Sequence, residues 1–170
     1  MGKSPHLPDS KVFARPANVG VYYAQFRIRG RPAMTDVTVK VLKASSDQPL
    51  VYGWGSISKQ RDASGEMVDY WDTDNELYPE DVTEAAWRAF MLNSRHMDVQ
   101  HDEKPMGRVV YAFPMLSDIA ESFGVLDALD RTGVIVGVQV DDPEVLAKFR
   151  SGEYAGFSIG GSAAYQDVTE

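Results

Sequence analysis

The stretch TGVIVGVQV, residues 132–140, constrains the fold of this chain more than any other segment. Valine recurs there at every second position, at Val134, Val136, Val138 and Val140. Strict alternation with a period of two is typical of a β-strand that buries one face, so this segment must lie in a sheet. The 170 residues suit one domain with a hydrophobic core of its own.

Similar patterns predict further strands. Gly53 and Gly55 interrupt one of them, and glycines inside a strand often mark a bulge or a sharp corner. A short link over residues 29–35, with Gly30 and Pro32, predicts a hairpin between the first two strands. A turn over residues 61–66 precedes a short returning strand. The predicted strands cover residues 18–30, 36–44, 50–58, 67–71, 107–115 and 155–161.

Two helices carry clear end signals. One begins near Pro79 with acidic residues in its first turn, and its predicted apolar stripe is Val82, Ala86, Ala89 and Phe90. The other has Asp142 as N-cap, Pro143 at the first position and Gly152 just past the end. Residues 117–129 are helical or mixed. About seven strands with two or three helices predict an α+β domain on a mainly antiparallel sheet, open or closed into a barrel.

We divide the chain into a flexible N-terminal arm over residues 1–17, one domain over 18–164 and a C-terminal tail over 165–170. The polar start of the chain lacks an apolar segment typical of a secretory signal, and no apolar run approaches the ~20 residues of a membrane helix. We therefore expect no membrane association.

Composition excludes several kinds of site. The chain has no cysteine, which excludes disulfides, thiolate metal ligands and a cysteine nucleophile. Its net charge is −8 and its pI is near 4.8, and nucleic-acid binding needs a basic cluster, so we expect no nucleic-acid partner.

Ser158 is the candidate nucleophile, because it stands in the small-residue run AGFSIGG at the edge of a predicted strand. A serine hydroxyl needs a base, and His101, in a polar segment before another strand, can serve because imidazole titrates near neutral pH. The two residues are 57 positions apart. The residues alone favour the plainer alternatives, a packing role for Ser158 beside Gly160 and a surface role for His101. The pattern is also not the strand-to-helix nucleophile elbow of α/β-hydrolases.

A third catalytic member cannot be chosen by counting acidic residues. Asp142 lies between His101 and Ser158 in the sequence, although helix capping accounts for it without catalysis. Asp141, Asp118, Asp127 and Tyr111 stay open as alternatives.

A metal site would compete for the same residues. His96, Asp98 and His101 have a spacing that metal ligands can adopt, but no fourth ligand follows from the sequence. The acidic residues 72–84 fail as a calcium loop, because Leu77 and Thr83 stand where that loop needs Gly and Glu.

Several segments, taken in order, resemble the phage serine proteases of the XkdF type, a group placed with the prohead (capsid-maturation) proteases and similar in fold to herpesvirus assemblins. The resemblance covers residues 50–161, and its most specific parts are the SGEY…FSIGG ending and the spacing from His101 to Gly107. The segments are VYGWGSIS, YPEDVTEAAWRAFMLNSR, QHDEKPMGRVV and VIVGVQVDDPEVLAKFRSGEYAGFSIGG.

The resemblance implies a mainly antiparallel β-barrel flanked by helices, with Ser158 as nucleophile and His101 as general base. Backbone amides near Gly160 and Gly161 would stabilise the oxyanion. Asp142 is the tentative third member, because this chain has Tyr111 where the family often has an acidic residue.

The same resemblance implies a serine endopeptidase that cleaves scaffold protein, extensions of the major capsid protein and itself, inside the procapsid in the bacterial cytoplasm. No cofactor is expected, and a homo-oligomer is compatible with this function. The alternative is a non-catalytic capsid-assembly module that keeps the protease fold. A metal-binding protein is the third hypothesis.

Overall fold

The computed structural model describes residues 11–14, 25–30, 41–72, 75–97, 106–160 and 164–167. The strands are β1 (Lys11–Ala14), β2 (Gln25–Gly30), β3 (Val41–Ala44), β4 (Leu50–Arg61), β5 (Met67–Asp69), β6 (Glu76–Leu77), β7 (His96–Met97), β8 (Gly107–Met115), β9 (Arg131–Val140), β10 (Tyr154–Gly160) and β11 (Ala164–Asp167). The helices are α1 (Glu80–Asn93), α2 (Ser117–Ser122) and α3 (Pro143–Ser151), with a 3₁₀ turn η1 (Leu126–Ala128).

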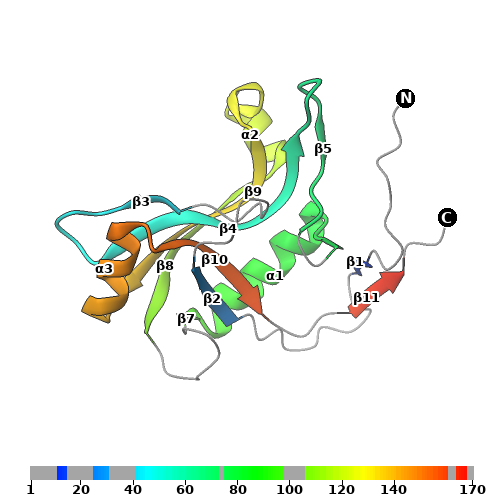
Figure 1. Cartoon of the computed structure of the whole chain (residues 1–170). Helices are drawn as coiled ribbons and strands as arrows, with labels where there is room; N and C mark the ends of the chain where they lie inside the picture. The colour runs from blue at the N-terminus through cyan, green and yellow to red at the C-terminus, as the bar shows by residue number, and fades with distance from the viewer. Residues whose placement is uncertain are drawn as a thin grey trace.

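The larger sheet has the strand order β10-β2-β7-β8-β9-β4-β3, and β5 pairs with β4 as the returning strand of a hairpin (Figure 1). All neighbours are antiparallel except β2 and β7, which run in the same direction. The smaller sheet has the order β11-β1-β6. The predicted α+β class and mainly antiparallel sheet are confirmed.

The predicted closed barrel is wrong for the part of the chain that the structure describes. The end strands β10 and β3 do not pair, although Cα atoms of β10 come within 8 Å of β4, so the sheet is strongly curled. Helix α3 lies against both end strands, and its Phe149 ring packs 5.6 Å from the rings of Tyr154 and Phe157. Packing of α3 against both end strands thus joins the two ends of the sheet without backbone pairing between them.

The predicted hairpin between β2 and β3 is also wrong, since the two strands lie at different places in the sheet. Strand β2 pairs with β10 and β7, whereas β3 pairs with β4. Its predicted turn, residues 31–35, lies outside the described residues. The predicted arm and tail contain β1 and most of β11, which pair with each other, and the division into domains stays a prediction.

The main core lies against β9. Its four valines are at most 1% exposed, as the sequence pattern predicts, and they pack with Trp87 and Phe90 of α1 and with Phe149 of α3. On the opposite face of the sheet a second cluster joins Trp54, Ile57 and Tyr70. Among the described residues, no helix has the length and apolarity that a bilayer crossing requires.

Helix α1 buries a different stripe from the predicted one. Thr83, Trp87 and Phe90 face the core, while Val82, Ala86 and Ala89 are half-buried beside them. Pro79 is the N-cap residue, one position before the helix. Helix α3 follows its prediction closely, with Asp142 as N-cap and Gly152 left-handed at φ 77°.

Gly55 allows α1 to approach the sheet. The register of β4 shifts between Trp54 and Ser56, which confirms the predicted bulge. A Cβ atom at Gly55 would collide with the Trp87 ring and would lie 2.8 Å from Val136 Cγ1. The Trp87 indole also donates a 2.8 Å hydrogen bond to Ser56 Oγ. Glycine at this position therefore makes room for the largest side chain of the helix.

We expect Gly55→Ala to lower the free energy of unfolding by about 1–3 kcal/mol, because overpacking a tight core costs that much. Urea unfolding measures the change. In a Trp87→Leu background the same substitution should cost clearly less, because the smaller side chain leaves room for the new methyl group. Equal costs in both backgrounds would show that the Trp87 contact is not the cause.

A carboxylate fixes the start of α1. Glu80 Oε1 accepts hydrogen bonds from Thr132 Oγ1 (2.6 Å), Ser117 Oγ (2.8 Å) and Ser117 N (2.9 Å), and Glu80 Oε2 lies 3.4 Å from Lys59 Nζ. Burial alone would raise the pKa of Glu80. The hydrogen bonds and the Lys59 charge outweigh burial, so the pKa lies below its ordinary value. One carboxylate thereby joins α1, α2, β4 and β9.

A carboxyl whose pKa is lowered on folding stabilises the protein above its ordinary pKa and loses that contribution as the pH falls through the lowered value. We expect Glu80→Gln to lower the free energy of unfolding at pH 7 by about 1–3 kcal/mol. The difference from wild type should shrink as the pH falls from the ordinary pKa of a glutamate, about 4.3, through the lowered value of Glu80. Urea titrations across this range, with the exposed Glu84→Gln as control, measure it. A pH-independent difference would refute the role of the charge.

Candidate active site

Ser158 lies in β10, the end strand of the larger sheet. Its register partner is Arg27 of β2, and the next pair is Ile159 with Phe26. Phe157, the preceding residue, is 1% exposed and belongs to the main core. Because successive residues of a strand belong to opposite faces, position 158 belongs to the face away from that core.

His101 lies outside the described residues, between β7 and β8. Those two strands form an antiparallel pair, with Met97 opposite Gly107 and a 2.9 Å hydrogen bond from Met106 N to Met97 O. The residues that flank the segment containing His101, Met97 and Met106, are thus held together where β7 ends and β8 begins.

Strand pairing connects the end of β7 to the position of Ser158 through β2. Met97 of β7 is the register partner of Phe26, and Phe26 is the register partner of Ile159. Strands β7 and β2 are parallel, so the chain leaves Met97 in the direction that leads along β2 from Phe26 to Arg27. Arg27 is the register partner of Ser158, so this direction leads toward the level of Ser158. The strand leading to His101 therefore lies two strands from β10, with its last residue level with the residue after Ser158.

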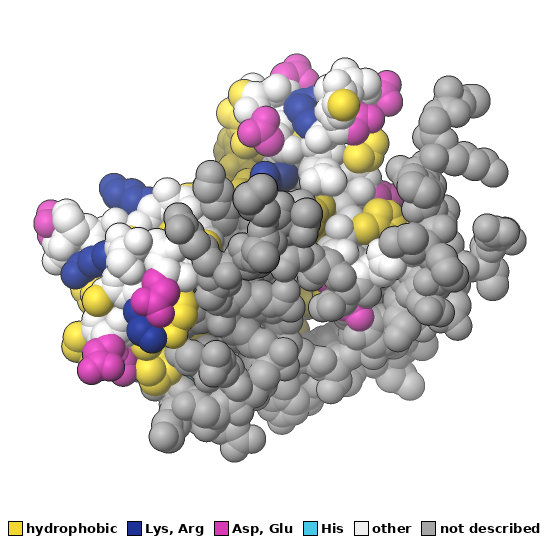
Figure 2. Space-filling model, viewed as in Figure 1, with side chains coloured by type: hydrophobic (Ala, Val, Ile, Leu, Met, Phe, Trp, Pro, Cys, Tyr) yellow, Lys and Arg dark blue, Asp and Glu magenta, His cyan; other side chains and the backbone are white. Residues whose placement is uncertain are grey.

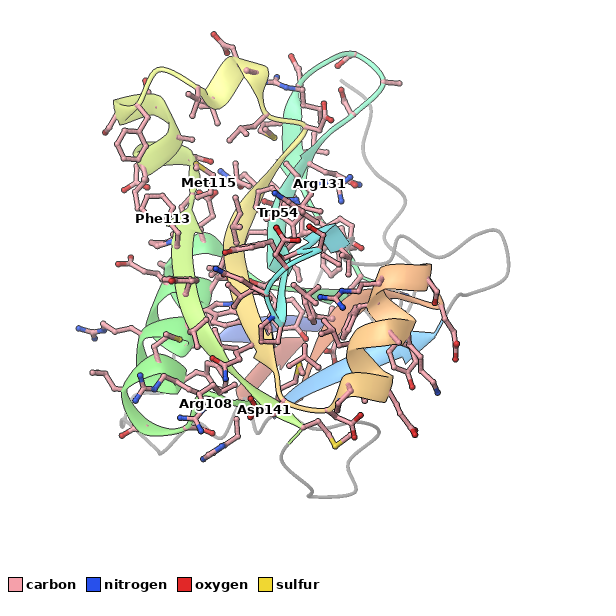
Figure 3. The ribbon with its side chains drawn as sticks, turned by 90° about the vertical axis from the view of Figure 1, so that its left-hand side faces the viewer. Trp54, Arg108, Phe113, Met115, Arg131 and Asp141 are labelled. Carbon is pink, nitrogen blue, oxygen red and sulfur yellow. The ribbon has the colours of Figure 1, made fainter. Side chains whose placement is uncertain are left out.

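Asp141 and Asp142 lie at the same end of the sheet. The Asp141 backbone N–H donates to Met106 O at 2.9 Å, next to the segment that contains His101. Asp141 Oδ1 accepts from Gln139 Nε2 at 2.9 Å. Figure 3 shows Arg108 and Asp141 together at this end, with Phe113, Met115 and Arg131 toward the other.

Asp142 caps α3, as the sequence predicts. Its Oδ1 atom accepts hydrogen bonds from Glu144 N at 2.7 Å and from Val145 N at 3.2 Å. These bonds satisfy backbone donors that the first turn of a helix leaves open. A catalytic role for Asp142 remains a prediction beside this structural one.

The other acidic alternatives lie far from this end. Asp118 is in α2 and Asp127 in η1, both beyond the last residue of β8, and Asp127 lies 4.0 Å from Arg61 Nη2. Nine residues of β8 separate the two ends, which is about 30 Å of strand. Tyr111 is 59% exposed near the middle of β8. None of these three residues lies at the end where β7 and β8 join.

The metal hypothesis finds no support in the described residues. No group of three or more His, Asp or Glu side chains among them could hold a metal ion. His96 is exposed in β7 opposite Arg108, whereas Asp98 and His101 lie outside the described residues.

Sequence reasoning missed two features. The first is the Glu80 cluster, in which Lys59 Nζ lies 3.4 Å from Ser117 Oγ. Both groups bind the Glu80 carboxylate, so the arrangement serves to fix α1 and differs from a serine–lysine nucleophile, whose lysine must accept the serine proton. The second is Arg27, opposite Ser158. Neither contact has a local sequence signal, because each depends on strand pairing.

The larger sheet is curled and mainly antiparallel, and Ser158 lies on its end strand, two strands from β7. The family model described as "Putative phage serine protease XkdF" matches residues 38–167, and the chain belongs to this family. The resemblance noted from the sequence is thereby confirmed. No curated protein and no solved structure matches the chain.

The capping role of Asp142 can be separated from its charge. Asparagine caps a helix about as well as aspartate, so we expect Asp142→Asn to change the free energy of unfolding by less than about 0.5 kcal/mol. Asp142→Ala should lower it by about 1 kcal/mol, because two backbone N–H groups lose their acceptor. Urea unfolding measures both variants. Equal losses in the two would show that the charge stabilises the fold, beyond capping.

Proposed function

We propose that the chain is a serine endopeptidase of phage prohead maturation, which cleaves scaffold protein, extensions of the major capsid protein and itself. One observation carries the proposal: the strand register brings β7, which leads to His101, within two strands of Ser158. Neighbouring strands are about 4.8 Å apart, so Met97 and Ile159 are about 10 Å apart. His101 is four residues from Met97, and four residues span up to about 14 Å. A hydrogen bond between the two side chains is within reach.

In the proposed mechanism the His101 imidazole takes the Ser158 hydroxyl proton as the oxygen attacks the substrate carbonyl. The tetrahedral oxyanion accepts hydrogen bonds from backbone N–H groups at Gly160 and Gly161. The protonated imidazole then gives its proton to the leaving amine, and water hydrolyses the acyl-enzyme by the reverse sequence of proton transfers.

The third member of the triad orients the imidazole and stabilises its positive charge. Asp142 suits this role because it follows Asp141, whose backbone N–H binds Met106 O at the end of the sheet that is next to the His101 segment. Both capping bonds go to its Oδ1 atom, and in the proposed triad Oδ2 accepts from the His101 ring. If Asp142 acts in this way, Asp142→Asn folds normally and yet loses most of its activity.

The proposed substrates and compartment rest on the resemblance to the prohead proteases. A phage protease of this kind works in the bacterial cytoplasm inside the procapsid, where scaffold and capsid proteins surround it. Activity must wait for assembly, and a site completed by crowding or by a second copy of the chain would supply that control.

We expect wild-type protein, co-expressed with its neighbouring capsid and scaffold proteins, to give defined fragments in mass spectrometry. Ser158→Ala should give none, because the nucleophile is lost, and His101→Ala should slow cleavage at least 1000-fold. Wild-type protein should also react with a fluorophosphonate probe at Ser158.

Ser151→Ala, which removes an exposed serine of α3, is the matched control and should cleave like wild type. Thermal unfolding of every variant shows that the fold is kept. Uncut proteins and an unlabelled wild-type chain in assembled shells would favour the non-catalytic assembly module instead.

A further inference from the structure

Strands β10 and β2 form a pair whose two faces differ in chemistry. On the core face Phe157 stands opposite Ile28, and Ile159 stands opposite Phe26. All four are large and apolar, and Phe157 is buried in the main core. This face has a structural role that accounts for its residues.

The other face combines small residues on β10 with polar residues on β2. Directly opposite positions of an antiparallel pair have Cβ atoms about 4.5–5.5 Å apart on one face. Arg27 and Arg29 are therefore placed beside the nucleophile position by the backbone alone. The pairs on this face are Gly156 with Arg29, Ser158 with Arg27, and Gly160 with Gln25.

The small residues and the arginines have complementary uses. Glycine in a strand lets another backbone come close, so Gly156 and Gly160 leave space for a peptide on both sides of Ser158. Arginine has a planar fork of donors that matches a carboxylate. Arg27 and Arg29 are two positions apart on one strand, about 7 Å along it, so both share one face.

The charge distribution supports a role for these arginines. The whole chain has a net charge of −8, so cations are in the minority. On the face shown in Figure 2, the described charged side chains mix both signs over α3 and at the end formed by α2 and β5. The register partners of Arg27 and Arg29, in contrast, are Ser158 and Gly156, which carry no charge.

We propose that Arg27 and Arg29 determine substrate specificity by binding an acidic side chain within two residues of the scissile bond. The proposal rests on the proposed protease function of Ser158. Arg27 is level with Ser158 and Arg29 is level with Gly156, while the neutral Gln25 is level with Gly160. The preference for an acidic residue is therefore confined to one side of the scissile bond.

The experiment uses a peptide library derived from a bacterial proteome, which the 170-residue chain cleaves, and mass spectrometry identifies the cleavage sites. Wild type should enrich Glu or Asp at one or two positions on one side of the cut. A matched pair of peptides with Glu or Gln at the enriched position should differ in kcat/KM by at least about tenfold, because a charge-assisted hydrogen bond is lost.

Arg27→Gln and Arg29→Gln should each reduce this ratio, and the double variant should bring it close to one. Arg27→Lys keeps the charge without the fork, so it should retain part of the preference. Gln25→Ala, at the neutral position of the same face, is the matched control and should keep the wild-type ratio. A wild-type pattern without acidic enrichment, or a pattern unchanged in the double variant, overturns the proposal.

Labelling of Ser158 by a fluorophosphonate probe separates this proposal from the one on which it rests. If all variants are labelled and cleave, but without acidic preference, the specificity proposal fails and the protease function stands. If the wild type is neither labelled nor able to cleave any peptide, both proposals fail. Thermal unfolding identifies a variant that has lost its fold, and Arg27→Lys then stands in for Arg27→Gln.

Discussion

The row of four valines in β9 is the constraint on which the rest of the structure depends. These side chains are almost fully buried, and β4 and β8 pair with β9 along its length, so cover must come from the faces of the sheet. Helices α1 and α3 supply it on one face. Gly55 lets Trp87 approach the sheet, and the Glu80 carboxylate holds the start of α1 against β4, β9 and α2. Because α3 also packs on Phe157, the same core orients the strand that contains Ser158.

Features encoded by neighbouring residues could be predicted, and features that depend on distant pairing could not. The β8 and β9 patterns and the Asp142 cap are local signals, and each matches the structure. The predicted hairpin between β2 and β3 is wrong because β2 pairs with β10, and residues near the predicted turn carry no information about so distant a strand. The closed barrel fails because the end strands β10 and β3 do not pair, and no local pattern shows which strands lie at the ends of the sheet. The α1 stripe was misplaced because Trp87 is matched to Gly55, which lies 32 positions away.

The candidate site divides in the same way. Residue chemistry and the family resemblance single out Ser158 and His101, but the sequence gives no sign of how strands 57 positions apart come together. The register supplies that information, since Met97, Phe26 and Ile159 form one row across β7, β2 and β10. It also places Arg27 opposite Ser158, a pairing that no local pattern indicates. His101 itself lies outside the described residues, so its role remains a prediction.

In the proposed protease, the row of Met97, Phe26 and Ile159 also offers a way for activity to depend on assembly. Strand β10 is anchored on its core face by Phe157, but its link to β7 passes through β2. The pairing of β2 with β7 involves Phe26 and Met97, and β7 has only two residues. So short a parallel contact contributes little free energy by itself, because parallel pairing is slightly weaker per residue than antiparallel pairing. In the proposed protease, a contact that strengthens this pairing would hold β10 level with β7 and leave the valine core unchanged. Assembly would then switch on the proposed proteolysis by stabilising one strand pair, without refolding the domain.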